Sequence, residues 1–363
     1  MIDPQITKIE VHAHTVPTDL PEADGTFEWN SITLVLAEIF AGGKTGLGYT
    51  YGNAAIGKVA EHLAARNLQG QSPFSIPMLR ARMLRNIRND GNRGLAAMAL
   101  SMLDVALWDL KARLLGCSVS QLMGKACDAV AIYGSGGFTS YSPEQLEQQF
   151  ANWTEAGIRM VKMKVGSDPS ADPQRVKLVR KTVGDDAGLF VDANGAYTAK
   201  QALKLAEAFD EQRVSWFEEP VSSDQLEDLR FVRDRAPAGM DIAAGEYAYT
   251  GFDFRRMLEA GAVDVLQADA TRCGGFSGFL AAADIAACFG CPVSSHCAPS
   301  IHMHVGCAVP RFRHLEYFHS HVRIERMLFD GFIEQKDGFM TPDPSRPGMG
   351  LTFKQKDALR YAA

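Results

Sequence analysis

The chain has 363 residues, a length that predicts two domains more readily than one. Its net charge of −6 excludes the basic footprint of a nucleic-acid-binding protein, and no apolar run reaches the roughly 18 residues of a membrane span. The first residues lack a basic segment followed by an apolar one, so we expect no secretory signal and a cytoplasmic location.

The chain begins with strand-like segments. Apolar and polar residues alternate over residues 6–16, and a second strand-like run covers 32–40. The pair Gly42-Gly43 predicts a turn before residues 46–49. These segments predict a small sheet at the start of the chain.

Residues 56–125 follow a helical pattern. The clearest helix covers 94–115, where apolar residues recur at helical spacing and Gly116 provides a C-cap signal. Together with the preceding strands, these helices predict an α+β domain over residues 1–125.

From residue 129 short apolar strands alternate with amphipathic helices. We expect the helices over 143–156, 173–183, 199–209, 223–235, 252–260 and 275–289. Such alternation implies a parallel sheet, and seven or eight units over 126–322 fit a (β/α)7–8 TIM-type barrel better than an open sheet. No GxGxxG follows the first strand, which argues against a dinucleotide-binding fold.

The remaining residues, 323–363, are rich in Gly and Pro, and we expect them to pack back onto the first domain. The seven cysteines argue against a disulfide framework, because their number is odd and the chain is long. Cys288 and Cys291 have CxxC spacing but no second pair, so packing is favoured over metal or redox use.

Ionisable side chains end the apolar runs of the second half at steps of 28, 26, 28, 23, 27 and 20 residues. They are Lys164, Asp192, Glu218, Glu246, Asp269, His296 and Glu316. One strand and one helix fill such a step, and parallel barrel strands present their carboxyl ends at one mouth. The phase of the series therefore predicts an active site there.

Three carboxylates, Asp192, Glu218 and Glu246, end consecutive predicted strands. Hard oxygen ligands of this kind suit an octahedral Mg²⁺ that keeps positions open for water and substrate. The alternative is that each carboxylate only caps the following helix. Glu219 follows Glu218, and strand alternation sends only one of the two toward the metal.

Lys162 and Lys164 lie two apart on one strand, so both face the same side, which we expect to be the barrel interior. Two ammonium groups near a dication should lower each other's pKa, and a lysine tuned toward neutrality is a general base. The alternative is an exposed lysine pair on an edge strand.

Asp269 and His296 end the next two strands. A carboxylate on one imidazole nitrogen fixes the tautomer and makes the other nitrogen a better base, although a lone histidine is more often a core residue. His302 and His304 do not share the phase and are expected to be helix residues. Glu316, at the last strand, is placed to contact a substrate carboxylate.

This set, with Asn194 two residues after Asp192, resembles the mandelate racemase subgroup of the enolase superfamily. The resemblance extends over nearly the whole chain, including the helical stretch with Asp104 and Trp108-Asp109. It implies an N-terminal capping domain completed by the C-terminal tail. It implies that the three carboxylates bind one Mg²⁺ per subunit. It also implies that Lys164, with Lys162 beside it, and His296, oriented by Asp269, are bases on opposite faces of the substrate. Glu316 would contact the substrate carboxylate.

In this family a loop of the first domain covers the barrel mouth, and here it corresponds to residues 17–30. No Lys or Arg occurs between Lys8 and Lys44, so a second substrate carboxylate would find no cation on this loop. We expect Asp24 and Trp29 of this loop, together with Asn194 of the barrel, to contact the substrate. Four acidic residues offer acceptors for hydroxyls, or simply face water: Asp19, Glu22, Asp24 and Glu28.

The leading hypothesis is therefore a Mg²⁺-dependent acid-sugar dehydratase that forms an enediolate and then a 2-keto-3-deoxy acid, with a monocarboxylic sugar acid preferred over a diacid. A racemase, epimerase or cycloisomerase on a related hydroxy acid or lactone is the alternative. A non-catalytic descendant that binds sugar acids is a third possibility. The expected partner is a small-molecule carboxylate, with no nucleic acid or membrane, and the family commonly forms homo-oligomers.

Overall fold

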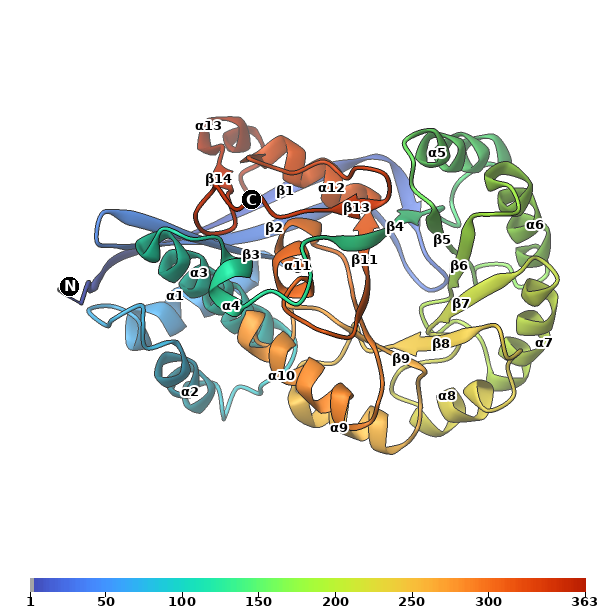
Figure 1. Cartoon of the computed structure of the whole chain (residues 1–363), viewed down its shortest axis with the longest axis horizontal. Coiled ribbons are helices and arrows are strands. Elements are labelled where there is room, and N and C mark those ends of the chain that lie inside the picture. Colours follow the sequence, from blue (N-terminus) through green and yellow to red (C-terminus); the bar gives the residue numbers. More distant parts are fainter. Residues whose placement is uncertain (1–2) are drawn as a thin grey trace.

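The computed structural model describes residues 3–363 and shows a closed barrel beside a sheet-and-helix unit (Figure 1). The sheet contains β1 (Ile6–Ala23), β2 (Glu28–Ala41) and β3 (Lys44–Tyr51), all antiparallel in the order β1-β2-β3. The predicted strands and the turn at Gly42-Gly43 are confirmed, but β1 and β2 are longer than expected, because they continue as a hairpin toward the barrel.

Four helices follow the sheet: α1 (Ala55–Asn67), α2 (Ile76–Asn86), α3 (Leu95–Leu115) and α4 (Val119–Met123). The first three pack with the sheet around a core of aliphatic residues. Helix α3 is buried on nearly all sides, and its chain reverses at Gly116, which has φ +71°. The predicted helix over 94–115 and its glycine C-cap are thus confirmed.

The barrel consists of eight parallel strands, and the pairing of the last with the first closes it. The strands are β4 (Val130–Gly136), β5 (Met160–Lys164), β6 (Gly188–Asp192), β7 (Val214–Glu218), β8 (Asp241–Ala244), β9 (Val265–Ala268), β10 (Val293–Ser295) and β11 (Phe312–Phe318). The intervening helices are α5 (Pro143–Glu155), α6 (Asp172–Val183), α7 (Ala199–Asp210), α8 (Leu226–Arg233), α9 (Gly251–Glu259), α10 (Gly275–Cys288) and α11 (Pro299–Gly306). The predicted TIM-type barrel is confirmed, with eight strands.

Side chains inside the barrel form two layers. A lower, mostly aromatic layer contains Tyr133, Phe190, Trp216 and His314, whose rings lie 4.8–6.4 Å apart. Strand alternation places the next inward residue two positions further along each strand, at Ser135, Asp192, Glu218 and Glu316. The aromatic layer is therefore a floor beneath a polar layer at the carboxyl ends of the strands.

The C-terminal segment runs back along the first sheet (Figure 1). Its elements are α12 (His319–Leu328), β12 (Phe329–Asp330), β13 (Phe339–Met340), β14 (Thr352–Phe353), α13 (Gln355–Ala358) and a 3₁₀ turn over Leu359–Tyr361. Ala363 donates its amide to the carbonyl of Ala13 on β1. The predicted boundary at residue 322 lies inside α12, because that helix is continuous; the division into domains stays a prediction.

Three buried carboxylates connect the parts of the molecule. Asp104 on α3 accepts hydrogen bonds from the amide and hydroxyl of Ser277 on α10. Asp109 accepts from the amides of Leu47 and Met349. Glu325 on α12 accepts from the hydroxyls of Tyr49 on β3 and Ser300 on α11.

No helix within residues 3–363 is both long and apolar enough to cross a membrane.

Candidate active site

The segment predicted to be a loop over residues 17–30 is the end of the β1–β2 hairpin. Its tip is stabilised by Asp24, whose carboxylate accepts hydrogen bonds from the amides of Thr26 and Phe27. The hairpin is attached to the loop after β4, because Thr139 donates its amide to the carbonyl of Ala23.

Gly25 shows how closely this tip approaches the barrel mouth. A β-carbon at this position would lie 2.5 Å from the carbonyl oxygen of Ala193 and 2.7 Å from that of Val165, at the carboxyl ends of β6 and β5. Only glycine fits such a contact without displacing backbone. The hairpin tip, residues 24–27, therefore lies directly on the barrel mouth as a lid.

The three carboxylates at the ends of β6, β7 and β8 come together. Asp192, Glu218 and Glu246 are all buried, and each offers an oxygen within 4.8 Å of the others. The indole of Trp216, two residues before Glu218, donates to Glu218 Oε2 at 3.0 Å. Gly245 lets the chain pass close to β9, since a β-carbon there would lie 2.2 Å from the carbonyl oxygen of Gln267.

The electrostatics of this group fit a divalent cation. Burial and the neighbouring Asp192 raise the pKa of Glu218 to about 8. Oε2 of Glu246 is buried without a hydrogen-bond partner among the described residues. Crowded carboxylate oxygens that repel one another, one of them without a hydrogen-bond donor, are the kind of ligand set that Mg²⁺ takes in proteins. The residues present therefore fit the ion.

Both predicted lysines point into the barrel. Lys162 Nζ lies 2.6 Å from Glu218 Oε1, 2.9 Å from Glu316 Oε1 and 3.2 Å from Asp192 Oδ2, at the centre of the strand ends. Lys164 lies nearer the opening and donates to Asp192 Oδ2 at 2.5 Å and to Asn194 Oδ1 at 3.0 Å. The alternative of an exposed lysine pair is wrong, since both side chains are buried.

Without a cation, the two lysines have raised pKa values; the lowering expected beside a dication stays a prediction. Burial lowers the pKa of Lys162, but Glu218 and Glu316 more than compensate and hold it well above its usual value. Burial and repulsion from Lys162 lower the pKa of Lys164, but the carboxylates around it, Asp192 first, together raise it overall. The carboxylates that surround the two lysines are the cause of this rise.

His296 and Asp269 form the expected pair. His296 Nδ1 lies 2.8 Å from Asp269 Oδ2, so Nδ1 carries the proton and Nε2 is the acceptor. Burial lowers the pKa of His296, but nearby Glu246 and the bond to Asp269 raise it overall. His302 lies in α11 as predicted, where its Nε2 accepts the amide of Ala270 and lies 3.7 Å from Asp269 Oδ1.

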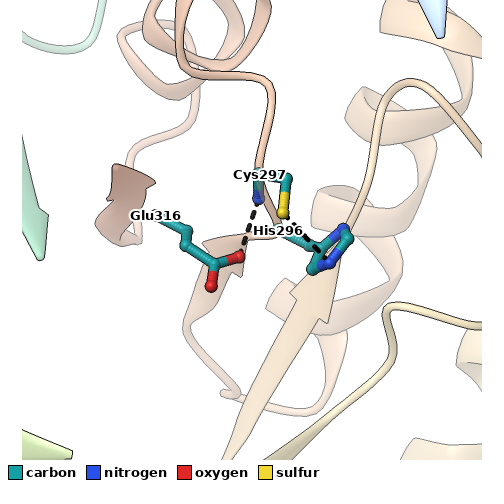
Figure 2. A group of neighbouring side chains, drawn as sticks. All are labelled: His296, Cys297 and Glu316. Atoms are coloured by element: carbon teal, nitrogen blue, oxygen red, sulfur yellow. Dashed lines mark hydrogen bonds between the residues drawn. The ribbon is translucent and has the colours of Figure 1, made fainter. Parts of the chain in front are cut away.

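Glu316 points from the last barrel strand toward the residues that follow β10, as Figure 2 shows. Its Oε1 accepts from Ser135 at 2.6 Å, and its Oε2 accepts from the amide of Cys297 at 2.8 Å. Cys297 Sγ lies 3.2 Å from His296 Nε2. The thiol therefore faces the nitrogen that a base would use.

A cavity of about 650 Å³ opens between the lid and the strand ends. Lys164, Asn194, Glu246, His296, Cys297 and Glu316 line it together with Asp24 and Trp29 of the lid. Lys162 and Asp192 lie beneath this lining rather than in it. The structure thus gathers the predicted site residues around one cavity from seven barrel strands, β5–β11, and the hairpin.

Among the residues that line this cavity, sequence reasoning missed Cys297, Arg272 and His321. Arg272 donates to the carbonyl of Glu246 at 3.1 Å, and its Nε lies 3.5 Å from Asp269 Oδ2. Its place three residues after Asp269 was the available signal. His321 stacks on Tyr51 at 3.5 Å between ring centroids, and no sequence signal marked it.

The acidic lid residues differ in their surroundings. Glu22 is buried and accepts from the indole of Trp29 and the hydroxyl of Ser320, so it is not an open acceptor. Asp19 pairs with His319 on the outside of the cavity. Of the four predicted acceptors, Asp24 and Glu28 line the cavity, and one oxygen of Asp24 is used within the lid.

Comparison with known proteins identifies both halves of the chain. Residues 8–124 match the mandelate racemase / muconate lactonizing enzyme N-terminal domain, and residues 145–358 match the enolase C-terminal domain-like family. A solved mandelate racemase/muconate lactonizing enzyme-like protein from Rubrobacter xylanophilus is 49% identical, with a TM-score of 0.97 over 99% of this chain and 100% of that one.

Characterised relatives are more distant. The L-talarate/galactarate dehydratase of Salmonella typhimurium is 32% identical over 90% of this chain and 81% of its own length. A mutant L-talarate/galactarate dehydratase, solved with Mg and L-glucarate, has a TM-score of 0.92 at 28% identity over 100% of this chain and 93% of that one. The D-galactarolactone cycloisomerase of Agrobacterium fabrum is 31% identical over 80% of this chain and 78% of its own length.

Proposed function

We propose that this chain, which belongs to the mandelate racemase subgroup of the enolase superfamily, is a Mg²⁺-dependent acid-sugar dehydratase. The reaction would begin with removal of the proton next to a substrate carboxylate. One observation carries the proposal: the carboxylate group, Lys164 and the Asp269-held His296 meet at one cavity. The named dehydratase relatives support the same reaction class.

Asp192, Glu218 and Glu246 would hold the metal ion. When bound, Mg²⁺ would stabilise negative charge on the substrate carboxylate and offset the carboxylate field that raises the pKa of Lys164. Glu316 holds Lys162 and the amide of Cys297 in place at the far side of the site.

The proton transfers fall to Lys164 and His296. Their strands, β5 and β10, are separated by β4 and β11 in one direction and by four strands in the other, so the two groups approach a bound substrate from different sides. Lys164 or His296 Nε2 takes the α-proton. Protonated His296 gives a proton to the departing β-hydroxyl, which leaves as water, and the enol product rearranges to a 2-keto-3-deoxy acid.

A specific observation keeps a second function in view. Lys164 and His296 can also remove a proton from one face of the substrate α-carbon and return one to the other face, which is racemisation or epimerisation. A cycloisomerase is also among the relatives. A non-catalytic sugar-acid-binding role would need a vacant ligand or base position. All of these positions are filled here, which argues against it.

The lid provides no cation for a second carboxylate, which favours a monocarboxylic sugar acid. Arg272 is a cation of the cavity outside the lid, although Glu246 and Asp269 already neutralise it. A sugar diacid would have to use this residue. A homo-oligomeric assembly and a cytoplasmic location stay predictions.

The test is incubation with a library of sugar mono- and diacids in D₂O with Mg²⁺. A dehydratase releases a keto acid, whereas a racemase or epimerase incorporates deuterium at the α-carbon without forming one. If neither signal arises from any acid that binds, the proposal of catalysis is wrong and the binding role remains.

A further inference from the structure

A second group of ligand atoms lies beside the carboxylate site. His296 Nε2, Cys297 Sγ and a Glu316 oxygen all lie within 4.8 Å of one another, and all three residues are buried (Figure 2). The set combines nitrogen, sulfur and oxygen, whereas the neighbouring set contains oxygen alone. Nitrogen and thiolate ligands favour zinc-like ions, and carboxylates alone favour Mg²⁺.

The backbone holds the thiol in this position. Cys297 and Ala298 both have left-handed φ angles, +52° and +41°, which non-glycine residues rarely adopt. The imidazole of His302 bonds the carbonyl of Cys297 at 2.7 Å, and the amide of Cys297 is held by Glu316. Two consecutive strained residues at one place are a feature that functional sites show.

The distances suit one small ion. Zn²⁺ lies about 2.3 Å from sulfur and about 2.0 Å from nitrogen in proteins. Both contacts can be made from a single point between Cys297 Sγ and His296 Nε2, which lie 3.2 Å apart. Glu246 Oε2, which is 3.4 Å from the same nitrogen, borders the position.

We propose that His296, Cys297 and Glu316 form a second metal site that binds Zn²⁺ and inhibits the enzyme. A metal on Nε2 occupies the lone pair that accepts the substrate proton. The site would therefore be an inhibitory metal site beside the Mg²⁺ site. The thiolate of Cys297 would make it prefer Zn²⁺ over Mg²⁺. This inference concerns inhibition and its ligands, and it does not depend on which sugar acid is the substrate.

The first test is spectroscopic and needs no substrate. Co²⁺, which takes zinc sites, shows a thiolate charge-transfer band in the near ultraviolet only when sulfur is a ligand. We expect this band in Mg²⁺-loaded wild-type protein and its loss in Cys297→Ser and Cys297→Ala. Cys127→Ser is the matched control, because Cys127 is an exposed thiol before β4, at the other end of the barrel. Absence of the band in folded wild-type protein, or its persistence in both Cys297 variants, would overturn the proposal.

The second test uses zinc inhibition, with either product formation or α-proton exchange as the readout. Zn²⁺ at saturating Mg²⁺ should inhibit wild type and Cys127→Ser alike, and inhibition of Cys297→Ser should need at least about tenfold more Zn²⁺. Zinc that merely displaces Mg²⁺ from the three carboxylates would inhibit all variants equally and would be reversed by more Mg²⁺. That result contradicts the proposal, whereas a thiolate band without any enzymatic turnover would contradict only the proposed function.

Discussion

The aromatic floor of the barrel and the charged layer above it are built from the same strands, two residues apart. Phe190 precedes Asp192 on β6, and Trp216 precedes Glu218 on β7. The lower layer excludes water with packed rings. The upper layer concentrates buried carboxylates and lysines whose pKa values are strongly perturbed.

The difference shows that the two layers are interdependent. The charged layer can exist in a dry interior because its charges neutralise one another and because a cavity opens on one side only. The floor contributes directly through the Trp216 indole, which donates to Glu218. Stability should therefore depend on the floor, and chemistry on the layer two residues further along each strand.

Replacement of one metal ligand should have the largest effect on activity of the changes considered, with little effect on stability. Asp192→Asn should lose Mg²⁺ affinity and all measurable activity, because it removes a charged ligand shared with both lysines. The fold should persist. Calorimetric Mg²⁺ titration and circular dichroism measure the two effects, with exposed Asp210→Asn as the control. Full activity without Mg²⁺ would refute the assignment.

The two proton-transfer residues should be separable. Lys164→Ala and His296→Asn should each lower the rate by about 10²–10⁴, the usual contribution of a general base. Each should abolish α-proton exchange for the configuration that faces it. The measurement is deuterium incorporation beside keto-acid yield. Wild-type exchange by both variants would show that neither residue is a base.

The floor should behave in the opposite way. Phe190→Ala should lower the free energy of unfolding by about 3–5 kcal/mol, because it leaves a cavity among packed rings. Activity per folded molecule should fall less than in Lys164→Ala. Denaturant unfolding and rates measured well below the melting temperature test this, with Phe190→Leu as the milder comparison. A Phe190→Ala variant that is stable but inactive would contradict the assignment of stability to the aromatic layer and of catalysis to the charged layer.

Glu325 provides a buried charge that lies outside both layers. Burial raises its pKa to about 7, above the roughly 4.3 of an unfolded glutamate, so the folded protein binds the proton more tightly. The resulting stabilisation is fully present below about pH 4.3 and is lost as the pH rises from there to about 7.

Glu325→Gln should therefore reduce the loss of stability between about pH 4 and pH 7, by up to about 3 kcal/mol. Melting temperatures across this range provide the measurement. Part of the pH dependence should remain, because burial raises the pKa of Asp104 to about 6 as well. An unchanged pH profile would show that Glu325 does not titrate in this range.

The lid should have the smallest effect on chemistry and a distinct effect on selection. Trp29→Ala and Asp24→Ala should change the ratio of rates between a sugar monoacid and its diacid more than the rate with the better substrate. Steady-state rates on matched acids measure this ratio. If a diacid is preferred and neither variant changes that preference, the argument from the absence of lid cations is wrong.

Spacing and alternation along the sequence were sufficient to predict most of the fold. The helix expected over 199–209 is observed over Ala199–Asp210, and the strand-end charges from Lys164 to Glu316 surround one mouth. These features are local or periodic patterns, so they can be recognised in a single amino-acid sequence. The hairpin character of the lid was missed, because its extension depends on contacts with the barrel.

The sequence by itself determined the order of the elements and which charged residues end the strands. In a parallel barrel, residues that recur once per strand and helix all lie at the same mouth. Only the tertiary structure decided the electrostatic state of the residues there. Lys162 has a raised rather than a lowered pKa because three carboxylates from three other strands surround it. Cys297 faces His296 because two left-handed residues, held by His302 and Glu316, turn the chain at that point.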